Sequence, residues 1–186
     1  SDVEDVIRKL ETLVDDLRRK VERIKERSRE LIKRIAEENR KVIEELERLL
    51  EELADVVRRK GSESEEVDRT AEEVRKKVKE LLDRVARSNE EILKENSKLL
   101  DDIRREIEEV ERRIKELAKD IARKIGDEKK VRDVRRVAEK VLREVRRLME
   151  EVERVARKTN RDIERLDEET RRVVEKVRKE IEDLRR

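Results

Sequence analysis

The chain has 186 residues, of which 58% are charged and 33% hydrophobic, and it contains no Phe, Trp, Tyr, His, Cys or Pro. Its 55 basic and 53 acidic side chains leave a formal charge of +2, which excludes a net field that would steer the whole chain toward nucleic acid or an anionic membrane. Apolar runs never exceed two residues, which excludes a transmembrane span, and the strong helix formers that make up most of the chain favour long helices over disorder.

The first predicted helix covers about residues 2–60. Ser1 and Glu4 have the spacing of a capping box at its start, and Gly61 can take the left-handed position that ends it. The second covers about residues 63–125. Ser62 or Ser64 can accept backbone N–H bonds at its start, and Ser62 with Glu65 fits a capping box.

The third predicted helix covers about residues 128–186. Gly126 is the expected stop before it, and Asp127 is its expected N-cap. Connections of two or three residues make consecutive helices antiparallel neighbours. The prediction is therefore an all-α, up-down-up bundle of three helices, each about 60 residues long, forming one domain over residues 1–186.

The apolar positions recur every 18 residues. This spacing is five turns at 3.6 residues per turn, the period of a straight α-helix, so we expect nearly straight helices. Each apolar stripe is about 140° wide, which suits one shared core. Stripes this symmetric are compatible with either handedness of the bundle. The positions that mark the recurrence are Leu17, Ile35 and Leu53, then Val85, Ile103 and Ile121, then Val134, Val152 and Thr170.

Polar side chains interrupt these stripes. Because an unpaired buried amide or hydroxyl costs about 1–3 kcal/mol, a stable core should bring them together. We expect them to form a buried hydrogen-bond network that specifies helix register. Six residues lie inside the stripes, Ser28, Asn39, Asn89, Asn96, Thr159 and Thr170, and three lie at their edges as possible flanking members, Ser88, Asn160 and Asp167.

Two polar layers follow from the hairpin geometry. Ser28 and Thr159 are 131 positions apart (159 − 28), as are Asn39 and Thr170 (170 − 39), which predicts matching heights on parallel helices. Reflection through the first connection brings Asn96 opposite Ser28. The same reflection leaves Asn89 about one turn out of level in the second layer. Ser88, Asp167 or a long Arg could bridge that gap.

No constellation of residues indicates catalysis, a metal or a cofactor. Asn, Ser and Thr supply neither a group that titrates near neutral pH nor an activated nucleophile, so we expect no enzyme. The outer faces carry Glu-to-Lys/Arg pairs at four-residue spacing, such as Glu72 with Lys76, which favour helicity. Acidic residues flank the basic segments 75–79 and 129–136, and no aromatic side chain is present to stack on bases. We expect neither a nucleic-acid nor a membrane partner.

The chain resembles computationally designed, parametric three-helix bundles with buried hydrogen-bond networks. The likeness covers all 186 residues and lies in the 18-residue repeat, the aliphatic core, the missing residue types and the short "GSES" and "GDEKK" connections. It implies a soluble, thermostable scaffold of synthetic origin, without an evolved biochemical function and without a required partner, and expected to be a monomer.

An alternative remains open. The chain could be a designed interaction module that self-associates or joins a heteromeric assembly. A second helix would then dock on the stripe edges, at Leu13, Leu31, Leu49 and Val56 or at Leu81, Leu99 and Leu117.

Overall fold

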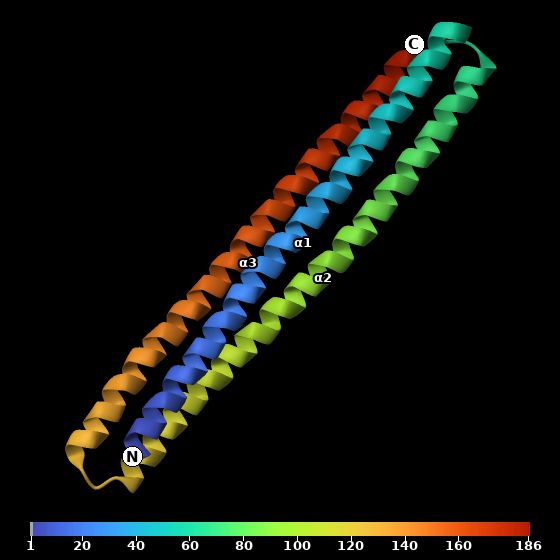
Figure 1. Ribbon diagram of the computed structural model, residues 1–186. Coiled ribbons are helices and arrows are strands. Elements are labelled where there is room, and N and C mark those ends of the chain that lie inside the picture. The colour runs from blue at the N-terminus through green and yellow to red at the C-terminus, as the bar shows by residue number, and fades with distance from the viewer. Residues whose placement is uncertain (1) are drawn as a thin grey trace. The chain divides into compact units, whose positions relative to one another are not determined.

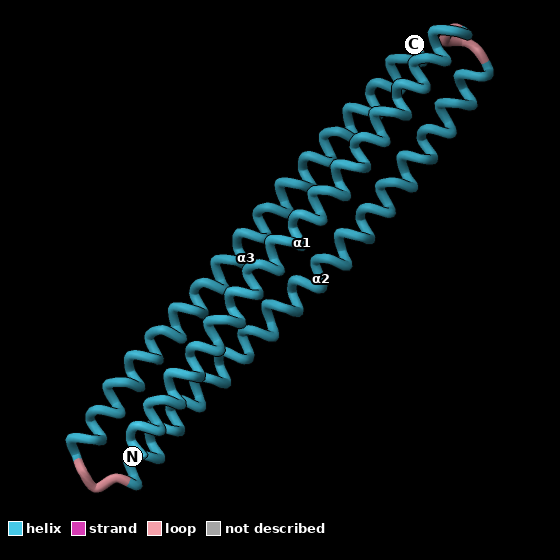
Figure 2. Tube along the Cα trace, in the orientation of Figure 1, coloured by secondary structure: helices cyan, strands magenta, loops and turns pink. Residues whose placement is uncertain are grey.

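The computed structural model describes residues 2–186, which form three helices and two short connections. The helices are α1 (Asp2–Lys60), α2 (Glu65–Lys124) and α3 (Glu128–Arg185), shown in Figure 1. Within the described residues everything outside them is turn or irregular chain, as Figure 2 shows. The prediction of an all-α fold with three long helices is confirmed.

The end of α1 follows the sequence signals closely. Gly61 has a φ of 82°, and its N–H donates to the Val57 carbonyl at 2.8 Å, so it is the left-handed residue that ends the helix. Basic residues fill the last turn, where they oppose the negative end of the helix dipole. The predicted capping box at the other end of α1 depends on Ser1, which lies outside the described residues.

The start of α2 corrects one prediction. Ser64 Oγ accepts a bond from the Glu66 N–H at 3.1 Å, so Ser64 is the N-cap, and the capping box predicted from Ser62 does not start the helix. The helix consequently begins at Glu65 instead of residue 63, and it ends one residue earlier than predicted. The N-cap predicted for α3 is confirmed, because Asp127 Oδ1 accepts the Lys129 N–H at 3.0 Å.

The described chain divides into two compact units, and each contains a segment of every helix. Unit 1 consists of Ser1–Arg29 and Glu95–Thr159, and unit 2 consists of Glu30–Lys94 and Asn160–Arg186. The expectation of one domain over residues 1–186 concerns how these units combine, and it remains a prediction.

In unit 1, ion pairs between helices define the chain directions. Arg18 pairs with Glu144 and Lys25 with Glu151, so the residue numbers of α1 and α3 rise together and the two segments are parallel. Lys20 pairs with Glu106 and Arg27 with Glu95, so α2 runs antiparallel to α1. Unit 1 therefore has the predicted up-down-up order.

Unit 2 has the same order. Lys60 pairs with Glu66 across the first connection, and Asn89 lies against Asn39, so α1 and α2 are antiparallel. Arg185 donates to Asp68 at 3.0 Å, which places the end of α3 beside the start of α2.

Each unit has its own apolar core of Leu, Ile, Val and Ala side chains contributed by all three helices. Leu10, Ile107 and Val145 are among the least exposed residues of unit 1, and Leu46, Val67 and Val177 among those of unit 2. Within the described residues no large hydrophobic side chain is exposed. The single methionine, Met149, packs against the core of unit 1.

The predicted 18-residue recurrence is confirmed by burial. All nine positions that mark it, from Leu17 in α1 to Thr170 in α3, are at most 9% exposed. At two points of the α1 stripe a neighbour takes the core position, since Val14 and Val56 are buried while Leu13 and Val57 are half-buried. The buried face therefore follows the natural period of the helix along its whole length.

We predict that Gly61→Ala lowers the free energy of unfolding by about 1 kcal/mol, because an L-residue is strained in the left-handed conformation. Gly126→Ala is the matched control, since both sites have no heavy atom within 4 Å of an added Cβ but only Gly61 has a positive φ. Chemical denaturation of both variants measures the difference, and an equal effect at the two positions would contradict the assigned cap.

Candidate functional site

The candidate site is the set of polar side chains inside the two cores. All six residues predicted to lie within the stripes are at most 9% exposed, namely Ser28, Asn39, Asn89, Asn96, Thr159 and Thr170. Their burial agrees with the helical-wheel placement. The three edge residues differ among themselves, because Ser88 is half-buried while Asn160 and Asp167 are exposed.

In unit 1, the Ser28 hydroxyl donates to Asn96 Oδ1 at 2.7 Å. Both side chains are almost completely buried, at 2% and 6% exposed, so the bond lies in a low-dielectric interior. It joins α1 to α2, as the reflection through the first connection predicted. A buried hydroxyl and a buried amide oxygen thereby satisfy each other.

Thr159 does not complete a three-membered layer with this pair. It is buried, but the described residues show no hydrogen bond from it to Ser28 or Asn96. The ion pairs between α1 and α3 in unit 1 give the physical reason, because they join residues 126 apart (144 − 18 and 151 − 25). A spacing of 131 therefore places Thr159 about five residues, or roughly 7.5 Å, from the level of Ser28.

In unit 2, Asn89 Nδ2 donates to Asn39 Oδ1 at 3.2 Å. The direct bond removes the need for the bridging side chain considered above, and the exposed Asp167 does not supply one. Asn39 Nδ2 and Asn89 Oδ1 have no hydrogen-bond partner. This pair is therefore half-satisfied, whereas such groups usually find partners in folded proteins.

Thr170 meets its hydrogen-bonding requirement within its own helix. Its hydroxyl donates to the Leu166 carbonyl at 3.0 Å, four residues back along α3. This back-bonding is a common solution for Thr inside a helix and needs no partner on another helix. The buried side-chain bonds among the six residues therefore join α1 to α2 in each unit.

The register of α1 and α2 explains how both pairs form. The residue numbers of Lys20 with Glu106 and of Arg27 with Glu95 sum to 126 and 122 in unit 1, and those of Lys60 with Glu66 sum to 126 in unit 2. The buried pair of unit 1 sums to 124 (28 + 96), midway between its two ion pairs, and that of unit 2 sums to 128 (39 + 89), which is two residues or about 3 Å from its ion pair. Asn89 is therefore not a full turn out of level with its partner, and short side chains span the remaining offset.

Ion pairs surround the buried pair of unit 1. Lys25 contacts Glu22 at 3.1 Å and Glu151 at 3.0 Å, and its side chain is only 20% exposed. Partial burial opposes its charge, but the hydrogen bonds to the two carboxylates outweigh that effect and raise the pKa of Lys25. A paired, half-buried cation therefore links α1 to α3.

Arg104 forms a two-pronged pair with Glu153, through Nε at 2.6 Å and Nη2 at 3.1 Å, which joins α2 to α3 in unit 1. The hydrogen bond to Arg104 lowers the pKa of the Glu153 carboxyl, although partial burial acts in the opposite direction.

Within helices, many ion pairs join residues three positions apart, and Glu72 contacts Arg75 at 2.7 Å in place of the predicted Lys76. Pairs between helices were missed from the sequence because they depend on register.

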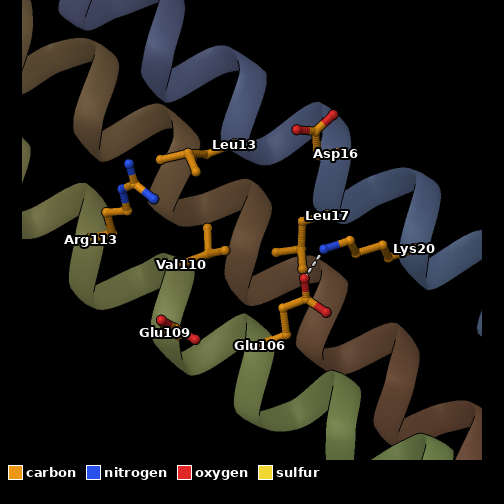
Figure 3. A pocket seen from close by; sticks show the side chains of 8 residues that line it. All are labelled: Leu13, Asp16, Leu17, Lys20, Glu106, Glu109, Val110 and Arg113. Atoms are coloured by element: carbon orange, nitrogen blue, oxygen red, sulfur yellow. Dashed lines mark hydrogen bonds and ion pairs between the residues drawn. The ribbon is translucent and has the colours of Figure 1, made fainter.

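The hollow shown in Figure 3 has a volume of about 250 Å³ and lies on unit 1, between α1 and α2. Leu13, Leu17 and Val110 line it along with charged side chains, and the ion pair of Lys20 with Glu106 crosses it. Two of its charged residues, Lys20 and Glu106, pair with each other, and the charged residues do not converge on a central point, so the hollow is a groove between helices, without the polar groups that orient a ligand.

Residues 2–186 contain neither a metal-binding cluster nor a membrane-spanning helix. No group of three or more Asp and Glu side chains there is arranged to hold a metal ion. No helix in that range is long and apolar enough to cross a membrane. The buried polar groups in that range are only Ser, Asn and Thr, so the cores contain no acid or base for catalysis.

The fold and the core define the class: the chain is an all-α three-helix bundle. Among solved structures it matches one described as "Computationally designed three helix bundle", with a TM-score of 0.65 and 17% sequence identity over 98% of this chain and 88% of that chain. At this identity the likeness concerns the fold. No protein-family model matches the sequence, and no curated protein matches it.

We predict that Asn96→Ala destabilises the protein by about 1–3 kcal/mol, because the Ser28 hydroxyl then lies buried without an acceptor. Ser97→Ala is the control, since Ser97 is exposed on the same helix and its loss should stay within about 0.5 kcal/mol. Urea denaturation compares the two variants, and an unchanged midpoint for Asn96→Ala would exclude a stabilising role for the pair.

We predict that Glu153→Gln lowers the melting temperature at pH 7 but not in acid. Because the folded-state pKa of Glu153 is lowered, its ionised form adds stability that is present above its ordinary pKa of 4.5 and is lost as the pH falls through the lowered value. The half-exposed pair should contribute less than about 1 kcal/mol. Glu150→Gln, on the exposed face of α3, is the control. A difference between wild type and Glu153→Gln that persisted at about pH 2 would contradict this account.

Proposed function

We propose that the protein is a de novo designed structural scaffold, with no evolved biochemical activity, whose buried polar residues specify the register of the helices. The observation that carries this proposal is that side-chain hydrogen bonds join α1 to α2 inside the core of each unit. The designed three-helix bundle that the chain resembles in fold supports the same origin.

The need for a register signal follows from the repetitive core. An apolar stripe that follows the helical period presents similar side chains after every turn, so α2 could slide along α1 with little loss of apolar contact. A slide of one turn, about 5.4 Å, would separate Ser28 from Asn96 and Asn39 from Asn89. The amides and hydroxyl would then be buried without partners, at about 1–3 kcal/mol each. The polar pairs therefore penalise the alternative registers.

A scaffold without catalysis is also supported by the chemistry of the interior. The buried polar groups of residues 2–186 do not titrate near neutral pH, and the grooves on each unit are lined by charges that neutralise one another. We expect no cofactor and no substrate for this protein.

The alternative of a helix-docking module has less support. Of the seven edge positions that would receive another helix, Leu31, Leu49, Val56 and Leu81 are already buried in their own units, and the other three are half-buried. Little apolar surface is left for a partner helix. We therefore propose a monomer as the working state.

The register proposal can be tested by replacing the two hydrogen-bonded polar pairs of the core with aliphatic residues. Four substitutions do this at the bonded pairs: Ser28→Ala, Asn96→Leu, Asn39→Leu and Asn89→Leu. We expect the free energy of unfolding to be unchanged or higher, because buried polar pairs often contribute less than apolar packing. We expect the register to become heterogeneous.

The register can be measured by electron–electron resonance between spin labels on Thr12→Cys and Arg113→Cys, both exposed on unit 1, because the chain contains no cysteine of its own. The polar chain should give one narrow distance distribution, and the aliphatic chain a broad or multiple one. A single narrow distribution in both would refute register specification. Sedimentation equilibrium should give the 22.6 kDa chain mass for the polar chain, and a mass that doubles with concentration would favour the docking module.

A further inference from the structure

The exposed charge of unit 1 is unevenly distributed. The α3 segment of this unit, residues 128–159, has 12 basic and 7 acidic side chains, a net charge of +5 (12 − 7). The continuation of α3 in unit 2, residues 160–185, has 8 basic and 9 acidic side chains, a net charge of −1 (8 − 9). The near-zero charge of the whole chain therefore conceals a strongly basic segment.

Pairing between helices increases this imbalance at the surface. Three of the seven carboxylates in the segment are half-buried and bind cations of other helices: Glu144 with Arg18, Glu151 with Lys25, and Glu153 with Arg104. All 12 basic side chains of the segment are exposed. Four carboxylates remain to balance them on the outer surface.

The basic side chains line the face of α3 that points away from the core. Counting 100° per residue, seven of them lie opposite the buried Val134, Val145 and Val152 and span about 39 Å, and one exposed carboxylate, Glu150, lies on the same face between Arg147 and Arg154. Within residues 2–186 none of the seven takes part in an ion pair. We call this set the basic stripe, and its members are Arg132, Arg136, Lys140, Arg143, Arg147, Arg154 and Lys158.

The stripe contains like charges four residues apart. Arg132, Arg136 and Lys140 follow one another at this spacing, as do Arg143 and Arg147, and such pairs repel each other on a helix. A bound polyanion would relieve the repulsion. By contrast, basic residues of α1 and α2 such as Arg48 and Arg105 pair with carboxylates three residues earlier in their own helix.

We propose that the basic stripe binds the phosphate backbone of double-stranded nucleic acid without sequence preference, a property separate from the proposed scaffold function. This proposal reverses the expectation from the sequence that there is no nucleic-acid partner, because that expectation was based on the charge of the whole chain and on the neighbours of each basic segment along the sequence, and not on the charge of one face of α3. A duplex presents a linear array of one charge per about 1.7 Å, which matches a straight line of unpaired cations. Binding of single-stranded nucleic acid is disfavoured, because the chain has no aromatic residue on which bases could stack. A bilayer surface is disfavoured because the described residues expose no large hydrophobic side chain as an anchor.

The test is fluorescence anisotropy with a labelled DNA duplex of mixed sequence, about 25 base pairs long, titrated with the full chain at about 50 and 200 mM salt. We expect a dissociation constant in the micromolar range that weakens steeply with salt, as the release of counterions requires. Arg136→Glu, Arg143→Glu and Arg147→Glu together should weaken binding at the lower salt concentration by at least about tenfold.

The matched control is Arg165→Glu, Arg172→Glu and Arg178→Glu, which changes the charge equally on exposed residues of α3 in unit 2. It should alter binding by less than about threefold. Circular dichroism and thermal melting must show that both variants remain folded. Absence of binding at about 50 mM salt, or an equal loss in both variants, would overturn the proposal. Sedimentation with phosphatidylserine vesicles in the absence of DNA binding would assign the stripe to membranes and also overturn it.

Discussion

The coincidence between the apolar repeat and the natural period of the α-helix is the constraint on which the other features of this protein depend. Because the buried positions return every 18 residues, each helix keeps the same face toward the core without any need for supercoiling. The same regularity has a disadvantage. A stripe that looks alike at every turn holds helices together but does not determine how far one has slid along another.

In the proposed function, buried polar groups and ion pairs would favour one register of the helices in different ways. The two buried pairs both join α1 to α2, so sliding of one helix along the other by a turn would break them. The pairs are not equally complete, since the Ser28 hydroxyl is satisfied while one donor and one acceptor of the Asn39–Asn89 pair are not. The half-satisfied pair opposes stability more than the first, and under the proposed function it would act by excluding wrong registers.

Sequence reasoning was sufficient for features determined by local chemistry. It identified the three helices, the left-handed Gly61, the Asp127 cap and all six buried polar residues. It was insufficient where the outcome depends on register or on competition between equivalent groups. Ser62 and Ser64 are both able caps, and the hydroxyl of Thr170 can bond its own helix as well as another. Matching Ser28 with Thr159 assumed an offset of 131 between α1 and α3, whereas the ion pairs of unit 1 have one of 126.

The buried hydrogen bonds between α1 and α2 also make the helices unequal. Among the described residues, the side-chain bonds from α3 to its neighbours are ion pairs, three in unit 1 and one at the end of unit 2. Cleavage of the chain between Lys124 and Glu128 would thus separate a hairpin joined by buried hydrogen bonds from a peptide held by apolar packing and ion pairs. Raising the ionic strength would weaken only the ion-paired part of that contact, so the apolar packing would still hold the peptide in high salt.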